Sequence, residues 1–312
     1  MLFSTNASRV CVLYAVSPLH AGAGQSTGAV DLPIQRERHT SWPMIQSSGL
    51  KGAFRDWFTR YYANSKAGEM GYESAHSQAK ELACKVFGRE ESPDGPEGHA
   101  GAISITDGRL LAFPVRSNAA PFVWVTAPYV LTRLARDLRL IPDAGLTLPG
   151  MELGSAPGSG EGMLIRGDIA AENGLVLEDL VVKIVESKTD AVALKAAFEA
   201  LAPQVARLVL ISDADFTYLV RNATEVQAQI AINPETGVTT AGSRRYQELL
   251  PADSALYTLV FFTTERTQNE PQPVEFIADL TMTALATHVQ IGGDMTLGRG
   301  LMEVRWLPGG KA

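Results

Sequence analysis

Hydrophobic positions along the chain follow two different spacings. Runs rich in β-branched and other apolar residues predict strands at residues 9–16, 102–105, 110–114, 122–125, 208–211, 256–263 and 301–306, with paired short strands within 175–185. Apolar residues three or four positions apart predict helices at residues 73–87, 129–140, 191–201, 213–220 and 274–288. A further helix is predicted to begin at Ser47 or Ser48, either of which can cap it, and to run to Tyr61.

Turn signals indicate how the predicted strands pair. Asp107-Gly108 separates two of them and is a strong hairpin signal. Residues 224–232 and 238–246 flank a turn at 233–237 and predict a long hairpin. Because the hairpin has too little bulk to bury a core of its own, we interpret it as an arm that projects onto a neighbour; a hairpin of the main sheet is the alternative.

The order of the elements indicates the fold class. Strands and helices alternate without the regular repeat of a doubly wound parallel sheet, and the hairpin signals imply antiparallel pairing. We therefore predict an α+β fold of ferredoxin-like type, enlarged by insertions. Residues 142–161, rich in Gly, Pro and Ser, are predicted to be a flexible insertion.

Residues 20–46 form a long predicted loop after the first strand. Gly22, Gly24 and Gly28 allow positive φ and close approach to a partner. Loops longer than about 12–15 residues are uncommon unless they are functional or disordered. This loop carries side chains suited to holding phosphates and moving protons: His20, Asp31, Gln35, Arg36, Glu37, Arg38 and His39. A solvated surface loop is the alternative interpretation.

Two further segments have features of phosphate binding. The helix after the loop begins with free amide groups and places Lys51 and Arg55 four residues apart on one face, which favours a bound phosphate. Residues 292–300 contain four glycines, so this backbone must turn tightly or let another surface come close. Arg299 within it suggests a phosphate contact, and a tight structural loop is the alternative.

The charge of the chain limits how it can contact nucleic acid. A net charge of −7 argues against coating nucleic acid by bulk electrostatics, so any such face must be local. Basic pairs that could form it are Arg36 with Arg38, Lys51 with Arg55, and Arg244 with Arg245. A solvated surface is the alternative for each pair.

Composition excludes several other classes of protein. The chain has 46% hydrophobic and 20% charged residues, as is ordinary for a soluble globular protein. It has no run of about 18 apolar residues and no basic region followed by an apolar core at its start, so we expect a cytoplasmic protein without membrane contact. Cys11 and Cys84 predict buried free thiols. The spacing of Gly22, Gly24 and Gly28 does not fit a dinucleotide fingerprint, and no P-loop is present.

Four motifs together resemble one family. Residues 30–37 read Val-Asp-Leu-Pro-Ile-Gln-Arg-Glu, and residues 50–55 read Leu-Lys-Gly-Ala-Phe-Arg. Residues 292–300 read Gly-Gly-Asp-Met-Thr-Leu-Gly-Arg-Gly, and residues 246–251 read Tyr-Gln-Glu-Leu-Leu-Pro. With His20 before them, these motifs resemble the backbone subunit of type III-B CRISPR RNA-guided effector complexes, in the RAMP superfamily. The likeness spans nearly the whole chain.

The resemblance implies a fold and a site. The fold would be a single domain over residues 1–312, with a ferredoxin-like (RRM-type) palm, an active-site loop at 20–46 and a thumb hairpin at 224–250. Asp31 matches the family's catalytic aspartate and is a candidate ligand, through water, of a divalent metal ion, Mg²⁺ or Mn²⁺. His20 and Glu248 match auxiliary positions. The positions that match contacts to guide RNA are Lys51, Arg55, Gly292, Gly293 and Arg299.

The resemblance also implies partners and a reaction. Copies of the subunit form a helical filament along a CRISPR guide RNA, together with other subunits, and cut complementary target RNA at regular intervals. A 2′-hydroxyl can attack its adjacent phosphate when the two are held in line, and an aspartate can accept the proton or hold hydrated Mg²⁺. We therefore expect a metal-dependent endoribonuclease. The alternatives are a non-catalytic guide-RNA scaffold, a guide-processing nuclease with His20 as general base, and a small-molecule enzyme, for which the chain lacks a cofactor fingerprint.

Overall fold

The computed structural model describes residues 7–91, 98–141, 144–146, 148, 156–169, 174–186, 191–266 and 270–309. Its helices are α1 (Ser47–Met70), α2 (Tyr72–Phe87), α3 (Pro128–Leu138), α4 (Ala191–Leu201), α5 (Asp213–Asn222), α6 (Val274–Ala284) and the short 3₁₀ helix η2 (Met295–Leu297). The first strands of the large sheet are β1 (Ser8–Ala15), β2 (Met44–Ile45), β5 (Ile103–Ile105), β6 (Gly108–Arg116), β7 (Phe122–Thr126) and β8 (Glu161–Arg166). The same sheet continues with β9 (Leu175–Leu177), β10 (Leu180–Ile184), β11 (Leu208–Ile211), β14 (Ala255–Phe262), β15 (His288–Gln290) and β16 (Leu301–Trp306). Two strand pairs stand apart, β3 (Gly88–Arg89) with β4 (His99–Ala100) and β12 (Glu225–Gln229) with β13 (Arg245–Leu249).

The large sheet is mixed and mostly antiparallel. Its strand order is β15-β16-β1-β14-β6-β7-β11-β8-β10-β9, with β2 paired to β6 and β5 paired to β14. β11 runs parallel to β7, and β10 runs parallel to β8. The central pairs β1–β14, β1–β16 and β6–β14 are antiparallel. The predicted combination of helices with largely antiparallel strands is therefore confirmed.

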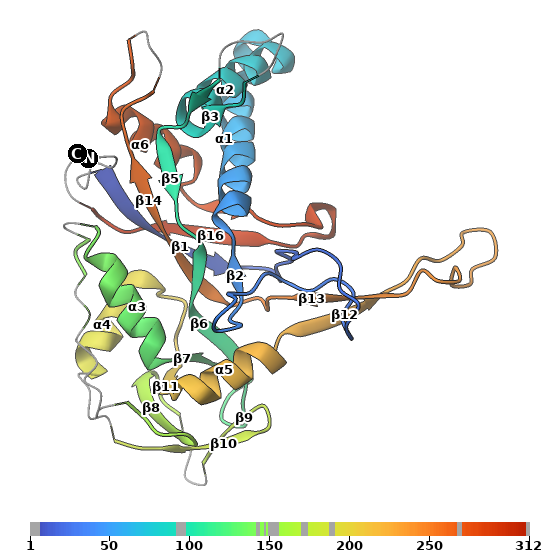
Figure 1. Ribbon diagram of the computed structural model, residues 1–312, viewed down its shortest axis with the longest axis vertical. Coiled ribbons are helices and arrows are strands. Elements are labelled where there is room, and N and C mark those ends of the chain that lie inside the picture. The colour runs from blue at the N-terminus through green and yellow to red at the C-terminus, as the bar shows by residue number, and fades with distance from the viewer. Residues whose placement is uncertain are drawn as a thin grey trace.

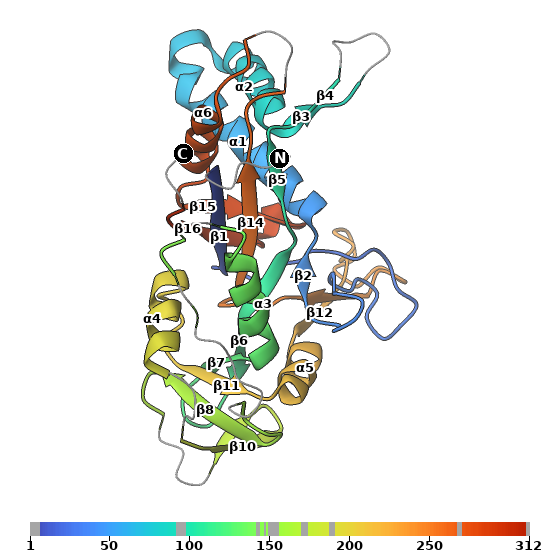
Figure 2. The ribbon, with the colours of Figure 1, turned by 60° about the vertical axis from the view of Figure 1, so that its left-hand side comes forward.

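Helices cover both faces of the central strands. Along β1, Cys11 and Leu13 join a hydrophobic cluster that includes side chains of α1, α2 and α6, whereas Val10 and Val12 join a second cluster with side chains of α3 and α4. Burial on both faces explains why residues 9–16 read as a nearly continuous apolar run. Figures 1 and 2 show α1, α2 and α6 at one end of the sheet and α3, α4 and α5 at the other.

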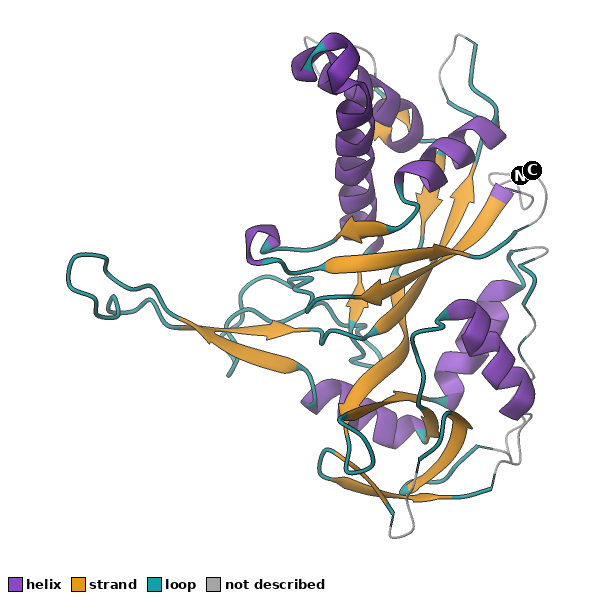
Figure 3. Ribbon diagram, turned by 180° about the vertical axis from the view of Figure 1, so that it is seen from behind, coloured by secondary structure: helices purple, strands orange, loops and turns teal. Residues whose placement is uncertain are grey.

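The β12–β13 hairpin projects sideways from the body of the molecule (Figures 1 and 3). It forms its own two-stranded sheet, paired from Glu225 opposite Leu249 to Gln229 opposite Arg245. The predicted hairpin is therefore confirmed, but regular pairing lies at its base and does not continue through residues 238–244. Because the hairpin is separate from the large sheet, the alternative of an ordinary hairpin in that sheet is wrong.

Three details of the predicted elements are corrected. β5 and β6 do not pair with each other, because both pair with β14, so Asp107-Gly108 is not a hairpin turn. Instead Asp107 Oδ1 accepts a hydrogen bond from the backbone N–H of Ser47 at 2.8 Å and satisfies an amide at the start of α1. The N-cap of α1 is Gln46, without a side-chain cap, rather than Ser47 or Ser48. α6 ends at Ala284, and the chain then enters β15.

Two other predictions concern the cysteines and the insertion at residues 142–161. Cys11 and Cys84 are buried free thiols, as expected. Much of the predicted insertion at residues 142–161 lies outside the described residues, and β8 begins at its last residue.

Candidate functional site

Strand β13, at the root of the projecting hairpin, and Leu250 just after it hold the first part of the loop at residues 20–46. Leu32 pairs in parallel with Gln247, and Leu19 pairs antiparallel with Leu250. The backbone N–H of Leu32 donates to Tyr246 O at 3.0 Å, and the N–H of Glu248 donates to Leu32 O at 3.0 Å. Figure 2 shows this loop beside the root of the hairpin. The loop is therefore fixed to β13 by backbone hydrogen bonds near both His20 and Asp31.

Asp31 is half-buried at the edge of β13. Its Oδ2 accepts a hydrogen bond from the backbone N–H of Tyr246 at 2.7 Å. Its backbone carbonyl accepts from the N–H of Ser26 at 2.9 Å, which closes the exposed tip of the loop. Among the described residues, Oδ1 of Asp31 makes no hydrogen bond, so one oxygen of a positioned carboxylate is available to a ligand.

His20 reaches the same strand two residues further along. Its Nδ1 lies 2.9 Å from the backbone carbonyl of Glu248. A carbonyl only accepts, so Nδ1 carries a proton, and a neutral ring then leaves Nε2 as the acceptor. A Cβ on Gly22 would lie 2.8 Å from Nε2, so glycine leaves this face of the ring open. At about 3.3 Å per residue, the attachment points of His20 and Asp31 are roughly 7 Å apart along β13.

Glu248 is buried, and both of its carboxylate oxygens are used inside the protein. Oε1 accepts from Arg36 Nη2 at 2.5 Å and from Thr224 Oγ1 at 2.8 Å. Oε2 accepts from the backbone N–H of Ile34 at 3.1 Å. Arg36 also donates to the carbonyls of Ser41 and Val220. Glu248 therefore links the loop to the hairpin, which favours a positioning role over the auxiliary catalytic role that the resemblance implies, and Arg36 is committed to the same link.

The glycine-rich segment at residues 292–300 packs against the other side of this site. The N–H of Gly293 donates to His20 O at 3.0 Å, and a Cβ on Gly292 would lie 2.4 Å from that oxygen. The side chain of Gln247 donates to Asp294 Oδ2 at 2.7 Å. Gly292 and Gly293 therefore allow the segment to approach His20 closely.

Arg299 joins this glycine-rich segment to the hairpin. Its Nη1 donates to Gln247 Oε1 at 2.6 Å and to Asp294 Oδ2 at 3.0 Å, and its Nη2 donates to Gln227 Oε1 at 2.7 Å. Three of the five donors that a guanidinium offers are thus used internally. Arg299 holds the root of the hairpin, and this internal role competes with the phosphate contact expected from the sequence.

We expect Gly300→Ala to destabilise the protein by at least about 1 kcal/mol more than Gly298→Ala. Both glycines have positive φ, at +71° and +72°, so both variants carry the strain of a left-handed alanine. A Cβ at Gly300 would lie 1.9 Å from Ile291 O, whereas one at Gly298 would meet no atom within 4 Å. Urea unfolding of the two variants and the parent measures the difference. Equal losses would show that Ile291 moves away easily.

The remaining basic candidates lie in separate places. Lys51 and Arg55 line a pocket of about 350 Å³ with Ser48, Arg89 and His99. Burial, with Arg55 and Arg266 nearby, lowers the pKa of Lys51. Arg38 is exposed and lines a second pocket, described below.

Two more candidates lie on the hairpin. The guanidinium of Arg244 lies 4.9 Å from the ring centre of Tyr246, and Arg245 Nε donates to Gln229 Oε1 at 3.0 Å. Both arginines are exposed, so the hairpin presents two cations to whatever it contacts.

Sequence reasoning missed Gln247, which is buried and connects the hairpin to the glycine-rich segment. It also missed Arg109, Arg133 and Arg136, which line the second pocket. The available signal for the last two was their spacing of three residues in the predicted helix at 129–140. Its apolar residues dominated that prediction.

The described residues contain neither a cluster of metal ligands nor a helix suited to a membrane. No group of three or more His, Cys, Asp or Glu side chains there could hold a metal ion. Within the same part of the chain, none of the helices has the length and apolar character needed to cross a membrane.

Comparison with known proteins defines the class of protein. A family model described as the RAMP superfamily matches residues 12–303, and the chain therefore belongs to this superfamily. The resemblance seen in the motifs is confirmed.

Within the superfamily, the chain is similar to a particular kind of subunit. It is 32% identical over 301 residues to the CRISPR system Cmr endoribonuclease Cmr4 of Pyrococcus furiosus, covering 94% of this chain and 93% of that protein. The crystal structure of oligomeric Cmr4 from Pyrococcus furiosus matches with a TM-score of 0.63 at 27% identity, covering 96% and 97% of the two chains. A chain of the type III-B Cmr-beta complex bound to cognate target RNA has the same fold, with a TM-score of 0.69 at 18% identity over 98% of each chain.

Proposed function

We propose that this chain is a backbone subunit of a type III-B CRISPR effector complex, which polymerises along guide RNA and cleaves complementary target RNA. The observation that carries the proposal is that β13, at the root of a projecting hairpin, positions both Asp31 and His20. The endoribonuclease name of the relative at 32% identity supports it. In this proposal the body is a ferredoxin-like palm, the hairpin at residues 224–250 is the thumb, and residues 20–46 are the active-site loop.

The reaction would be attack of a ribose 2′-oxygen on its adjacent phosphorus. The new P–O bond forms as the bond to the 5′-oxygen breaks, leaving a 2′,3′-cyclic phosphate and a 5′-oxygen that takes a proton from water to become a hydroxyl. The free Oδ1 of Asp31 would accept the proton from the 2′-hydroxyl, while the Tyr246 N–H holds Oδ2 in place. Nε2 of His20 is the second open acceptor at the site. In-line geometry imposed on the RNA supplies much of the acceleration.

The donor set fits a divalent ion only when RNA contributes to the coordination. Asp31 offers one carboxylate oxygen, and Mg²⁺ commonly combines one or two carboxylates with several waters and substrate phosphate oxygens. Asp31 would hold the ion directly or through water, and a bound ion would stabilise negative charge on the phosphate. Glu248 is excluded from this role while its two oxygens accept three hydrogen bonds.

Target cleavage by the assembled complex tests the proposal and its dependence on metal. We expect regularly spaced cuts in target RNA with Mg²⁺, with cyclic phosphate on the upstream product, and loss of the cuts in excess EDTA. Binding of target RNA measured in the same EDTA buffer separates loss of catalysis from loss of assembly. Unchanged cutting in EDTA would remove the metal from the mechanism.

Lys51 and Arg55 are proposed to hold the backbone of the guide RNA. They lie on α1 and line one pocket with Arg89, His99 and Glu90, so the cations there outnumber the carboxylate. Guide recognition through backbone charge needs no base contacts, because base pairing reads the sequence.

We expect Lys51→Ala to weaken guide binding, to reduce its salt slope by about one, and to leave cleavage positions unchanged. Lys66→Ala is the matched control, because Lys66 is an exposed lysine of the same helix outside the pocket. Protonated Lys51 binds phosphate and burial lowers its pKa, so guide affinity should fall with rising alkaline pH more steeply in the parent than in Lys51→Ala. Fluorescence anisotropy of labelled guide RNA at several salt concentrations measures affinity. Equal losses in both variants, or shifted cuts, would contradict the assignment.

One observation favours a second candidate function, a non-catalytic guide-RNA scaffold. The hydrogen bond from Tyr246 N–H gives Asp31 a structural task that does not need chemistry. The variant of Asp31 described in the Discussion separates the two functions.

A further inference from the structure

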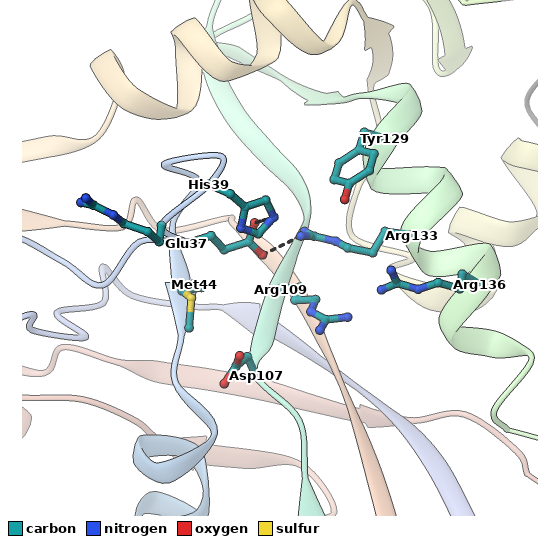
Figure 4. Close-up of a pocket in the computed structure, with 9 residues that line it drawn as sticks. Glu37, His39, Met44, Asp107, Arg109, Tyr129, Arg133 and Arg136 are labelled. Carbon is teal, nitrogen blue, oxygen red and sulfur yellow. Dashed lines mark hydrogen bonds and ion pairs between the residues drawn. The ribbon is translucent and has the colours of Figure 1, made fainter. Parts of the chain in front are cut away.

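A second pocket, of about 310 Å³, opens between the loop at residues 37–44, the start of β6 and helix α3 (Figure 4). Arg38 and Glu37 line it from the loop, Arg109 from β6, and Tyr129, Arg133 and Arg136 from α3. In this group, the sequence points to Glu37 and Arg38 of the loop and to no residue of β6 or α3.

The pocket carries an excess of positive charge. Four arginines line it together with the carboxylates of Glu37 and Asp107, and Asp137 pairs with two of these arginines. Asp137 accepts from Arg109 Nη1 at 2.5 Å and from Arg136 Nη2 at 2.8 Å. Burial lowers the pKa of Arg109, but Asp137 and Tyr257 more than offset this, so the net direction is a raised pKa. Four guanidiniums against three carboxylates leave a net positive site.

Arg133 is buried with hydrogen-bond donors to spare. Its side chain is 4% exposed, and Nη1 donates to Glu37 Oε1 at 2.6 Å. Its Nε and Nη2 are buried and have no hydrogen-bond partner among the described residues. The rings of Trp42 and Tyr129 lie 5.4 and 5.8 Å from the guanidinium carbon, but ring faces leave the in-plane N–H groups unpaired. Unpaired buried donors are costly and call for an acceptor.

The chemistry of the lining indicates which acceptor fits. Guanidinium forks match the oxygens of a phosphate, and those of Arg109, Arg133 and Arg136 lie around one small pocket (Figure 4). Tyr129 is 40% exposed beside them and offers a ring on which a base can stack. An aromatic ring among arginines favours a nucleotide over a protein carboxylate.

We propose that this pocket binds the phosphate of a nucleotide, with the base against Tyr129. Glu37 is six positions after Asp31, a reach of at most about 22 Å, so the pocket lies on the same loop as the candidate active site. A target RNA strand and a free mononucleotide offer the same phosphate chemistry. The inference that the phosphate belongs to the target RNA strand rests on the proposed function. The inference that the pocket binds a nucleotide phosphate does not.

Titration calorimetry of the full chain tests the pocket, with adenosine 5′-monophosphate, inorganic phosphate and adenosine as probes. We expect Arg136→Ala to weaken binding of the monophosphate and of phosphate at least fivefold. Tyr129→Leu should weaken binding of the monophosphate more than that of phosphate. Arg139→Ala is the matched control, because Arg139 is exposed just beyond the end of α3 and does not line the pocket; its affinities should stay within twofold of the parent.

Folding and specificity are controlled in the same experiment. Arg136 is 59% exposed on its side chain but donates twice to Oδ1 of the buried Asp137, so Arg136→Ala should lower the Tm modestly, and binding is compared well below the Tm of both proteins. The proposal is overturned if neither the monophosphate nor phosphate binds at millimolar concentration, or if Arg139→Ala loses as much affinity as Arg136→Ala. It is also overturned if an acidic peptide competes as well as the monophosphate, because the pocket would then be a protein interface.

Steady-state cleavage by the assembled complex identifies the source of the phosphate. If the source is the target strand, Arg136→Ala raises the KM for target RNA at least fivefold and free monophosphate competes with the RNA. If calorimetry shows the expected loss but the KM is unchanged, the RNA source is overturned and the ligand is a free nucleotide. Failure of the proposed catalytic function would appear as persistent cleavage by Asp31→Asn, a result that leaves the calorimetry untouched.

Discussion

Asp31→Asn should reduce target-RNA cleavage by the assembled complex at least about 100-fold while target binding is retained, the size expected when a general base is lost. Asparagine keeps the shape of the side chain, and its carbonyl oxygen can still accept the hydrogen bond that Tyr246 N–H donates at 2.7 Å. The substitution therefore removes the charge and leaves the attachment of the loop. Quantifying 5′-labelled products over time, beside a binding assay for the same RNA, measures the two properties separately.

Asp31→Ala serves as the companion variant because it removes both the charge and the hydrogen bond. If Asp31 acts in catalysis, Asn and Ala should lose cleavage to a similar extent. If Asp31 only holds the loop against β13, Asn should cut nearly as well as the parent and Ala should be impaired. That second pattern would make the non-catalytic scaffold the better description of this chain.

Local sequence patterns predicted most of the helices and strands, and they also pointed to the loop and the glycine-rich segment that form the candidate site. β-Branched runs and helical spacing placed β1, α2 and β11, because burial imposes these periodicities directly on the sequence. Asp107-Gly108 failed as a hairpin signal because β14, distant in sequence, pairs with both neighbouring strands and the carboxylate binds the start of α1 instead. A local turn propensity was overridden by contacts distant in sequence.

The arrangement of the site could not be predicted because its bonds join distant parts of the chain. Asp31 and Tyr246 are 215 positions apart, and Gln247 and Asp294 are 47 apart. Sequence alone also cannot tell a carboxylate open to substrate from one buried against an arginine. Asp31 has a free oxygen, whereas Glu248 has none, although both stand in motifs that suggest chemistry.

Glu248→Ala should destabilise the protein by about 3–5 kcal/mol, the cost expected when one partner of a buried ion pair is removed. The Arg36 side chain is 21% exposed and the Glu248 side chain 9%, so the guanidinium would be left largely buried without its carboxylate. The N–H of Ile34 and the hydroxyl of Thr224 would lose their acceptor at the same time. Urea unfolding monitored by tryptophan fluorescence measures the change.

Two matched variants show whether Glu248 positions the loop or takes part in the chemistry. Thr224→Val removes one neutral hydrogen bond to the same carboxylate and should cost about 1 kcal/mol. Glu248→Gln keeps one acceptor oxygen, which can serve either the N–H of Ile34 or the donors Arg36 and Thr224 but not both sides, so its stability should lie between those of the parent and Glu248→Ala. For a positioning residue, cleavage by these variants should follow stability, with Gln well above Ala. A Gln variant that folds like the parent and cuts as poorly as Asp31→Asn would instead place the Glu248 carboxylate in the reaction.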